Sequence, residues 1–196
     1  MKKSKIGFTL IEIVVSVAIF SIIIISMISI YILSSETSLK SDINRAMHEN
    51  TKNIVSEIYE DTIRNSILGV SQNVLDSCSF STSFNYKSGN KLCIGTNDYY
   101  VAKEDLGIYT RIDDLTYCQQ IDSQCYIVKK SPGLDPSPLT NSLVTIKSLD
   151  FKVSKSFVPK VTMNIVLQPT IKAGVRPSLI EQNKLILETT ISNRPF

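Results

Sequence analysis

Few residues in this sequence could carry catalysis. The chain contains one histidine, His48, which lies among polar residues in a segment with helical periodicity. No second metal ligand follows it at i+3 or i+4, so we expect a surface or interface histidine rather than a metal ligand. A Ser/His/Asp or Cys/His arrangement would need a histidine in the later part of the chain. The sequence also lacks a glycine-rich phosphate loop and a D-x-D-x-D-G calcium loop. We therefore expect a protein that is not an enzyme and has no cofactor.

Scattered acidic and aromatic side chains form two weaker candidate sites. We expect the acids to be solvated loop charges, with a calcium site in the Asp113–Asp122 loop as the alternative; they are Asp98, Asp113, Asp114 and Asp122. Four tyrosines favour core and sheet-face positions, with an exposed contact patch as the alternative; they are Tyr99, Tyr100, Tyr109 and Tyr117.

One carboxylate lies at the start of the longest apolar stretch. Glu12 is the only acid between Gly7 and Leu33, and no side chain from Ile13 to Leu33 is charged at neutral pH. A run of this length can cross a bilayer as one helix, which takes about 20 residues. A lone acid at the end of such a helix is costly in lipid and so indicates a functional role. The alternative is an ordinary signal anchor with Glu12 in the headgroup layer.

The residues before the apolar run predict its orientation and its processing. Lys2, Lys3 and Lys5 are the only charges there, and basic residues beside a membrane helix keep that end in the cytoplasm. The rest of the chain is then exported. A secretory signal peptide has a shorter apolar core that is followed by a small-residue cleavage site. Here the small residue, Gly7, precedes the run, which indicates processing between Gly7 and Phe8 with the helix retained.

The residues Gly7-Phe8-Thr9-Leu10-Ile11-Glu12, after a short basic leader, resemble the N-terminal motif of type IV prepilins and type II secretion pseudopilins. The resemblance implies that a prepilin peptidase cuts after Gly7 and methylates the new amine of Phe8. It also implies that Glu12 pairs with the Phe8 amine of a neighbouring subunit and sets the register as a subunit joins a filament, a role that we state as a hypothesis.

The same resemblance implies the fold and the partners. The expected fold is the α+β pilin-like fold, in which a long N-terminal helix packs on a C-terminal antiparallel β-sheet. The expected partners are other pilin or pseudopilin subunits, the prepilin peptidase, and an inner-membrane assembly platform with its ATPase motor. A nucleic-acid partner is not indicated, because removing the three leader lysines from the formal charge of +3 leaves a neutral mature chain.

Helical periodicity continues beyond the membrane segment. Apolar residues recur with i, i+3/i+4 spacing at Leu39, Ile43, Ala46, Met47, Ile54, Ile58, Ile63 and Ile67. No proline occurs before Pro132, and Gly69 is a suitable stop. The chain thus divides into a leader (1–7), a transmembrane and assembly half of the helix (8–33), an amphipathic half (34–68) and an exported β-rich domain (69–196).

Short alternating runs in the last part of the chain predict an antiparallel sheet. The expected strands are Tyr99–Lys103, Ile108–Ile112, Tyr126–Lys130, Leu143–Ser156, Lys160–Gln168 and Leu185–Ser192. The cleanest alternation is that of Val161, Met163, Ile165 and Leu167. We expect the proline-rich segment Ser131–Pro138 to be a turn-dense connection and Pro169–Asn183 to be a loop.

All four cysteines lie on the predicted exported side. They are Cys78, Cys93, Cys118 and Cys125. An even number in an oxidising compartment predicts disulfides, for which three connectivities are possible. We favour the sequential pairing Cys78–Cys93 and Cys118–Cys125, because it closes small loops. A zinc site is the less favoured alternative, because no C-x-x-C pair and no companion histidine are present.

The end of the chain resembles the larger minor pilins and pseudopilins of the J and W types, which close their sheet with a Thr-rich, Arg-terminated strand. Here that stretch is Thr189-Thr190-Ile191-Ser192-Asn193-Arg194. We therefore predict a minor pilin or pseudopilin in the cytoplasmic (inner) membrane that later joins a pilus or pseudopilus. The alternative is a membrane-anchored extracytoplasmic binding or sensor module that does not polymerise.

Overall fold

The computed structural model describes residues 9–72, 77–79, 86–120, 122–154, 158–170, 180 and 183–192. The chain divides into two compact units, Met1–Asp42 and Ile43–Phe196. Helix α1, Leu10–Arg64, contributes to both units. The first unit consists of the early turns of this helix, and the second contains its last turns and every strand.

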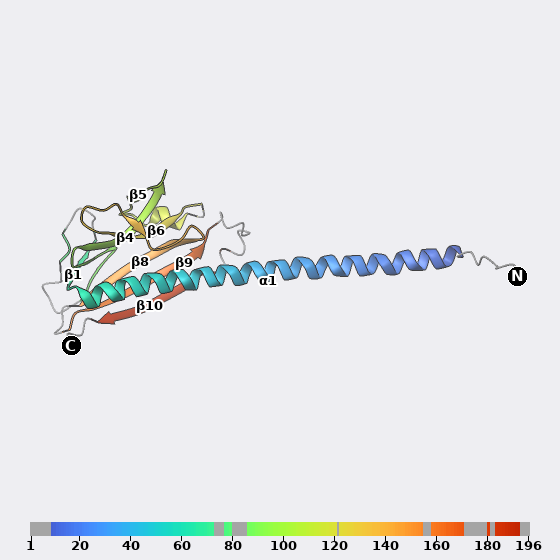
Figure 1. Ribbon diagram of the computed structural model, residues 1–196, viewed down its shortest axis with the longest axis horizontal. Helices are drawn as coiled ribbons and strands as arrows, with labels where there is room; N and C mark the ends of the chain where they lie inside the picture. The colour runs from blue at the N-terminus through green and yellow to red at the C-terminus, as the bar shows by residue number, and fades with distance from the viewer. Residues whose placement is uncertain are drawn as a thin grey trace. The chain divides into compact units, whose positions relative to one another are not determined.

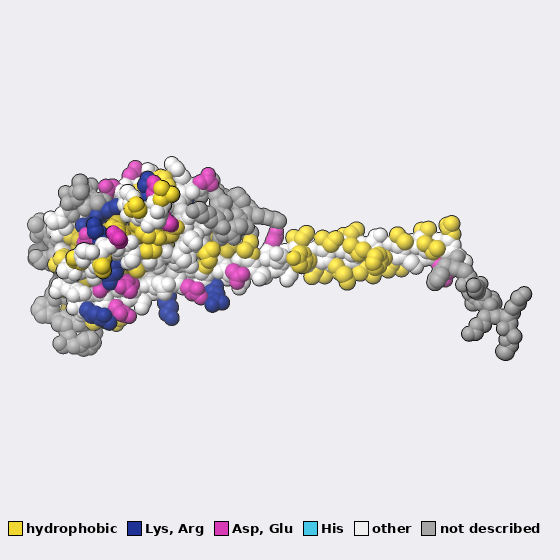
Figure 2. Space-filling view, turned by 45° about the horizontal axis from the view of Figure 1, so that its top comes forward, with side chains coloured by type: hydrophobic (Ala, Val, Ile, Leu, Met, Phe, Trp, Pro, Cys, Tyr) yellow, Lys and Arg dark blue, Asp and Glu magenta, His cyan; other side chains and the backbone are white. Residues whose placement is uncertain are grey.

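The first unit is a helix with no internal core. Large apolar side chains are exposed all along it, from Leu10 at 82% to Leu33 at 66%. Figure 2 shows hydrophobic side chains covering this part of the chain. By length and composition, α1 is able to cross a membrane. The predicted membrane segment is therefore helical from Leu10 onward, whereas Gly7 and Phe8 lie outside the described residues.

Within the second unit, α1 buries one face against the strands. Its buried apolar residues are Ile43, Ala46, Met47, Ile54 and Ile58, which confirms most of the predicted stripe. Two members of that stripe differ: Ile63 is 47% exposed, and Ile67 belongs to a strand.

The helix ends at Arg64, before the predicted Leu68. Strand β1, Ile67–Ser71, follows almost at once and pairs with the strand Lys91–Ile94. Burial explains the early end, because Ile67 and Val70 are nearly inaccessible in the strand. Gly69, the predicted helix stop, lies inside β1 with a φ of 124° at a register shift, where the left-handed half of the map suits glycine.

The strands form two antiparallel sheets (Figure 1). One has the order β1-β3-β4-β6-β7, with β5 also paired to β4, and contains β3 (Lys91–Ile94), β4 (Asn97–Asp105), β5 (Ile108–Arg111), β6 (Cys125–Lys130) and β7 (Ser137–Pro138). The other has the order β10-β9-β8-β2 and contains β2 (Lys87–Gly89), β8 (Val144–Ser154), β9 (Lys160–Pro169) and β10 (Leu185–Ser192). A short helix, α2 (Thr116–Gln119), precedes β6.

Alternating side chains of the long strands build the core. Val161, Met163, Ile165 and Leu167 of β9 are all fully buried, as their alternation predicts. Phe151 of β8 is buried too, and Tyr99 of β4 is the largest fully buried side chain. The expected α+β fold, with a long N-terminal helix packed on antiparallel sheets, is therefore confirmed.

The expected strands match β4, β5, β6, β8, β9 and β10, but β1, β2, β3 and β7 were not predicted. The dipeptide strand β7 lies at a sheet edge within the proline-rich connection, where proline's missing N–H is tolerated. Most of the expected loop Pro169–Asn183 lies outside the described residues.

Candidate functional site

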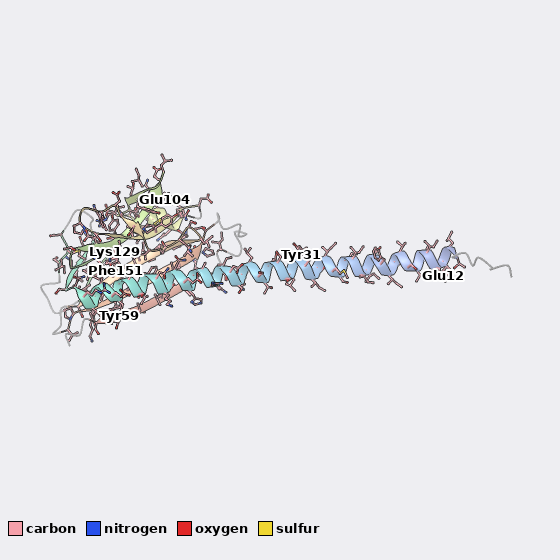
Figure 3. All side chains as sticks on the ribbon, viewed as in Figure 1. Glu12, Tyr31, Tyr59, Glu104, Lys129 and Phe151 are labelled. Atoms are coloured by element: carbon pink, nitrogen blue, oxygen red, sulfur yellow. A yellow bond between two sulfur atoms is a disulfide. The ribbon has the colours of Figure 1, made fainter. Side chains whose placement is uncertain are left out.

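The start of α1 is closed by a reciprocal pair of hydrogen bonds between Thr9 and Glu12. The Thr9 N–H and the Thr9 hydroxyl both donate to Oε2 of Glu12, at 3.1 Å each. In return, the Glu12 N–H donates to Oγ1 of Thr9 at 3.4 Å. This is a capping box, and the carboxylate also lies at the helix end where the macrodipole favours negative charge. The lone acid of the apolar run is thus held at the first turn of the helix (Figure 3).

The hydroxyl groups in the apolar run are satisfied inside the helix. Ser16, Ser21, Ser26 and Ser29 each donate to the backbone carbonyl four residues earlier, at 2.7 to 2.9 Å. Unsatisfied polar groups are expensive in lipid, whereas a serine bonded to its i−4 carbonyl leaves no free donor. These serines therefore do not prevent the segment from lying in a bilayer.

The length of the uncharged run matches a membrane. Ile13 to Leu33 lies wholly within α1, and at 1.5 Å per residue the run is about 30 Å long, close to the thickness of the hydrocarbon layer. Tyr31 is 75% exposed near the end of this run (Figure 3). Tyrosine favours the membrane–water interface, so the run has an interfacial aromatic residue at one end and a capped carboxylate at the other.

A second polar cluster fixes the last turns of α1 to the sheet. Lys129 of β6 donates to Glu57 at 2.6 Å and lies 3.1 Å from Oδ2 of Asp61. Asp61 also accepts hydrogen bonds from the Tyr99 hydroxyl and, at 2.7 Å, from the Asn97 amide of β4. Each charge in this cluster has an opposite charge in contact, so the cluster joins α1, β4 and β6 by compensated polar contacts.

The electrostatics of this cluster favour its charged form. Burial alone would raise the pKa of Asp61, but hydrogen bonds from Tyr99, Asn97 and Lys129 outweigh burial and hold that pKa below its ordinary value. Burial likewise opposes the charge of Lys129, and contacts with Glu57 and Asp61 still raise the pKa of its amine. Burial and the contact with Asp61 raise the pKa of Tyr99. An acid that stays ionised and an amine that stays protonated are suited to fixing a helix, not to exchanging protons at neutral pH.

The cysteines are joined sequentially. Cys78 is bonded to Cys93 of β3, and Cys118 of α2 is bonded to Cys125 of β6. Cys118 and Cys125 are fully buried, which makes their disulfide a structural link between α2 and the sheet. Disulfides of this kind persist in oxidising compartments.

The remaining predicted site residues do not converge. Asp98 pairs with Lys91 at 2.9 Å, and Asp114 accepts hydrogen bonds from Thr116 at the start of α2. His48 is exposed on α1. Within the described residues, no group of three or more His, Cys, Asp or Glu side chains is placed to hold a metal ion.

Three of the four tyrosines considered as a contact patch lie in strands. Tyr99 and Tyr100 are buried in β4, and Tyr109 of β5 packs edge-on against Tyr126 of β6 with ring centroids 5.4 Å apart. Tyr117 is 40% exposed. The tyrosines considered as a contact patch are therefore mainly core and sheet-face residues.

Sequence reasoning missed two parts of these sites. Thr9 was not singled out, although Thr9-x-x-Glu12 ahead of an apolar run is the sequence pattern of a capping box. The cluster around Asp61 left no such signal, because Lys129 and Glu57 are 72 residues apart in the sequence.

Comparison with known proteins adds one finding, at the N-terminus. A family model described as the prokaryotic N-terminal methylation motif matches residues 2–28. The matched segment includes the basic leader, Gly7, Phe8 and Glu12, followed by most of the apolar run. No curated protein and no solved structure matches the chain.

Proposed function

We propose that this chain, whose N-terminal methylation motif and α+β fold support a subunit of the type IV pilin and pseudopilin kind, is a minor subunit with a mechanical role. A prepilin peptidase cuts it between Gly7 and Phe8 and methylates the new amine. The mature chain then joins, or primes, a type IV pilus or a type II secretion-like pseudopilus. Its work is to assemble with other subunits and not to catalyse a reaction.

The observation that carries this proposal is a single carboxylate fixed at the first turn of an otherwise apolar helix. A charged side chain within a membrane helix costs about 3 kcal/mol, so a carboxylate there requires a partner. The capping box holds Glu12 beside Thr9, next to the position where cleavage would create the amine of Phe8. In our proposal, Glu12 pairs with the Phe8 amine of a neighbouring subunit and so sets the axial register.

The apolar helix supports storage in the membrane followed by transfer to a bundle. A helix that is apolar all round must bury itself in lipid or among other helices, and among the described residues the large apolar side chains from Leu10 to Leu33 are exposed. The motif and the helix support a single-pass, membrane-anchored protein. We propose that the N-terminus is cytoplasmic, that the β-rich domain is outside, and that an assembly platform with its ATPase draws the helix into the filament.

The proposed division of the chain follows from this route. Residues 1–7 are removed, residues 8–33 lie first in lipid and then among other subunits, and residues 34–68 lead into the exported domain, 69–196. A minor role is supported by the Thr-rich strand β10 near the chain end, and by a membrane segment that lacks the proline of many major pilins.

Replacement of Glu12 tests the proposal. In cells with a working assembly machine, Glu12→Gln should enter sheared filaments far less than wild type, because the glutamine cannot form the ion pair with the amine. Removing one partner of a buried ion pair leaves the other charge uncompensated at a cost of about 3 kcal/mol, which corresponds to roughly a hundredfold change in equilibrium. Glu49→Gln is the matched control, because Glu49 is an exposed acid on the same helix. Equal incorporation of the Glu12 variant and wild type would contradict the assembly role of this residue.

The same preparation separates the two classes of function. A membrane-anchored binding or sensor module would stay with the membrane fraction and would be absent from sheared filaments. Recovery of the wild-type chain in filaments would therefore exclude that class.

A further inference from the structure

The β4–β5 hairpin presents an apolar tip. Asp105 pairs with Ile108 in the register of the hairpin, so Leu106 and Gly107 form a two-residue loop. Their φ values are 51° and 82°, both positive, as a type I′ turn requires. Asn-Gly or Asp-Gly is the usual choice for such a turn, because the short polar side chain tolerates positive φ. Leucine is an unfavourable residue at this position.

The leucine is also almost fully hydrated. Leu106 is 99% exposed and Ile108 is 69% exposed. Glu104 and Asp105 flank them on the β4 side. The backbone at Leu106 indicates a function, because a non-glycine residue held at positive φ is a strained outlier and such outliers cluster at ligand clamps and other functional sites. We call Leu106 and Ile108 the hairpin tip.

The same unit carries a groove between α1 and β10. It has a volume of about 340 Å³ and is lined by Val55, Tyr59 and Ile63 of α1 and by Thr189–Ser192 of β10. Tyr59 is 50% exposed and Ile63 is 47% exposed; Figure 3 labels Tyr59 on the helix. Among the described residues, β10 pairs only with β9, so no described strand pairs with its other edge.

We propose that the hairpin tip of one copy inserts into the α1–β10 groove of a second copy of this chain. The apolar side chains of the tip would cover Tyr59 and Ile63, and an open strand edge accepts extended backbone by strand addition. The tip is flanked by two acids, Glu104 and Asp105. Around the groove, Glu60 is paired with Arg64, and the exposed acid Glu188 is outnumbered by Lys52, one turn before Val55, and Lys160, which pairs with Ser192 in register. Both lysine side chains are exposed, so the surroundings of the groove carry more positive charge than the tip.

The two surfaces cannot meet within one subunit. Figure 1 shows β5 and β10 on opposite sides of the β-rich unit. A contact between unlike surfaces of identical chains is heterologous, and such contacts generate rings or open helical arrays. The inference rests on the proposed function, and it adds that at least two copies are neighbours. One hairpin buries too little area for a stable complex alone, but confinement in a membrane raises the effective concentration.

Cross-linking of the full chain in membranes tests the contact. Two differently tagged copies are produced together, one with Leu106→Cys and the other with Ile63→Cys, and mixed dimers are counted after mild oxidation. We expect a mixed-dimer yield on the order of tenfold above two matched controls. One control replaces Leu106→Cys with Leu134→Cys, which is 67% exposed, and the other replaces Ile63→Cys with Ile186→Cys, which is 74% exposed. A yield equal to the controls would overturn the proposal.

A second variant tests the tip without damaging the hairpin. Leu106→Asn suits the positive φ of the turn, so it should fold at least as well as wild type. In this variant, the link between Ile108→Cys and Ile63→Cys should fall about tenfold, because the apolar tip is lost. An unchanged link at unchanged thermal stability would show that the tip is not the docking element.

A third cross-linking experiment separates this inference from the proposed function. Val17→Cys in two copies reports contact between the apolar helices. Links at Val17 without links between tip and groove would overturn the docking contact and leave the proposed function standing. Absence of both links would overturn both. A link from Ile63→Cys to a pilin-type subunit of different mass would overturn the assignment of a second copy as the occupant.

Discussion

At the scale of single residues, Asp61 is the polar side chain on which the attachment of α1 depends most. It is buried, and it contacts Tyr99, Asn97 and Lys129 from two strands. The neighbouring pair Glu60–Arg64 is also on α1, but both of its side chains are more than half exposed. The two acids are adjacent in sequence and therefore form a natural comparison of a buried ion pair with an exposed one.

Asp61→Ala should destabilise the β-rich unit by about 3 kcal/mol, because it leaves the partly buried amine of Lys129 with only part of its compensation. Glu60→Ala should change the free energy of unfolding by less than about 1 kcal/mol. Urea titration of the full chain in detergent, followed by the near-ultraviolet circular dichroism of the tyrosines, measures both. Equal effects of the two substitutions would show that the buried cluster does not hold the helix.

The shifted pKa of Asp61 also makes the free energy of unfolding depend on pH in the acidic range. The pKa of Asp61 is lower in the folded protein than its ordinary value of 3.8, so the folded state keeps the carboxylate charged to lower pH than the unfolded state. The resulting stabilisation is complete above that ordinary value and is lost as the pH falls through the folded pKa. Asp61→Asn should therefore lose less unfolding free energy than wild type between pH 5 and pH 3. A parallel decline in both proteins would contradict this assignment.

Some functional residues of this protein could be identified from the sequence and others could not. Glu12 could be singled out because a charge in an apolar run is conspicuous, and its partner Thr9 lies within the same turn. Asp61 was not singled out from the sequence, because its partners come from β4 and β6. Local chemistry is therefore predictable here, whereas contacts between distant segments depend on a strand order that the sequence does not state.

At the scale of elements, Gly89 of β2 lies close to β1 of the other sheet. A β-carbon built there would lie 2.3 Å from the carbonyl oxygen of Ser71 in β1, well inside any allowed contact. Gly89 is buried and pairs with Phe151 of β8. Glycine at this position lets β2 pass between β8 and the first strand of the other sheet.

Gly89→Ala should therefore destabilise the β-rich unit by about 1–3 kcal/mol, the usual effect of forcing extra volume into a packed region. Ser88→Ala, at the neighbouring position of the same strand, removes atoms instead of adding them and is the control. Thermal unfolding of the full chain in detergent compares the two. A larger loss of stability in Ser88→Ala than in Gly89→Ala would contradict the close approach.

Long strands whose side chains alternate between apolar and polar were predicted best. β10 was predicted with its observed bounds, Leu185–Ser192, and β9 nearly so, because the side chains of each strand alternate between a more exposed and a less exposed face. β3 is buried at all of its positions and so has no alternation to detect. The first two residues of β1 were predicted as the end of the helix, because Ile67 continues the helical spacing, whereas in the structure Ile67 pairs with β3.

At the scale of the whole molecule, the chain combines a membrane-compatible apolar helix with a disulfide-linked, β-rich unit. Among the described residues, the apolar side chains of the helix from Leu10 to Leu33 are exposed, whereas the second unit has a buried core. That contrast supports a subunit that lies in lipid and later packs against other subunits, and we propose that Glu12 provides the register. Its central requirement is processing of the N-terminus beside that carboxylate.

Mass analysis of the N-terminal peptide tests this requirement most directly. The protein is purified from the membranes of cells that contain an active prepilin peptidase, and the N-terminal peptide is identified by fragmentation. The account predicts a chain that begins at Phe8 and carries a methyl group on its amine. A chain that retains Met1 and the lysine leader in such cells would contradict it.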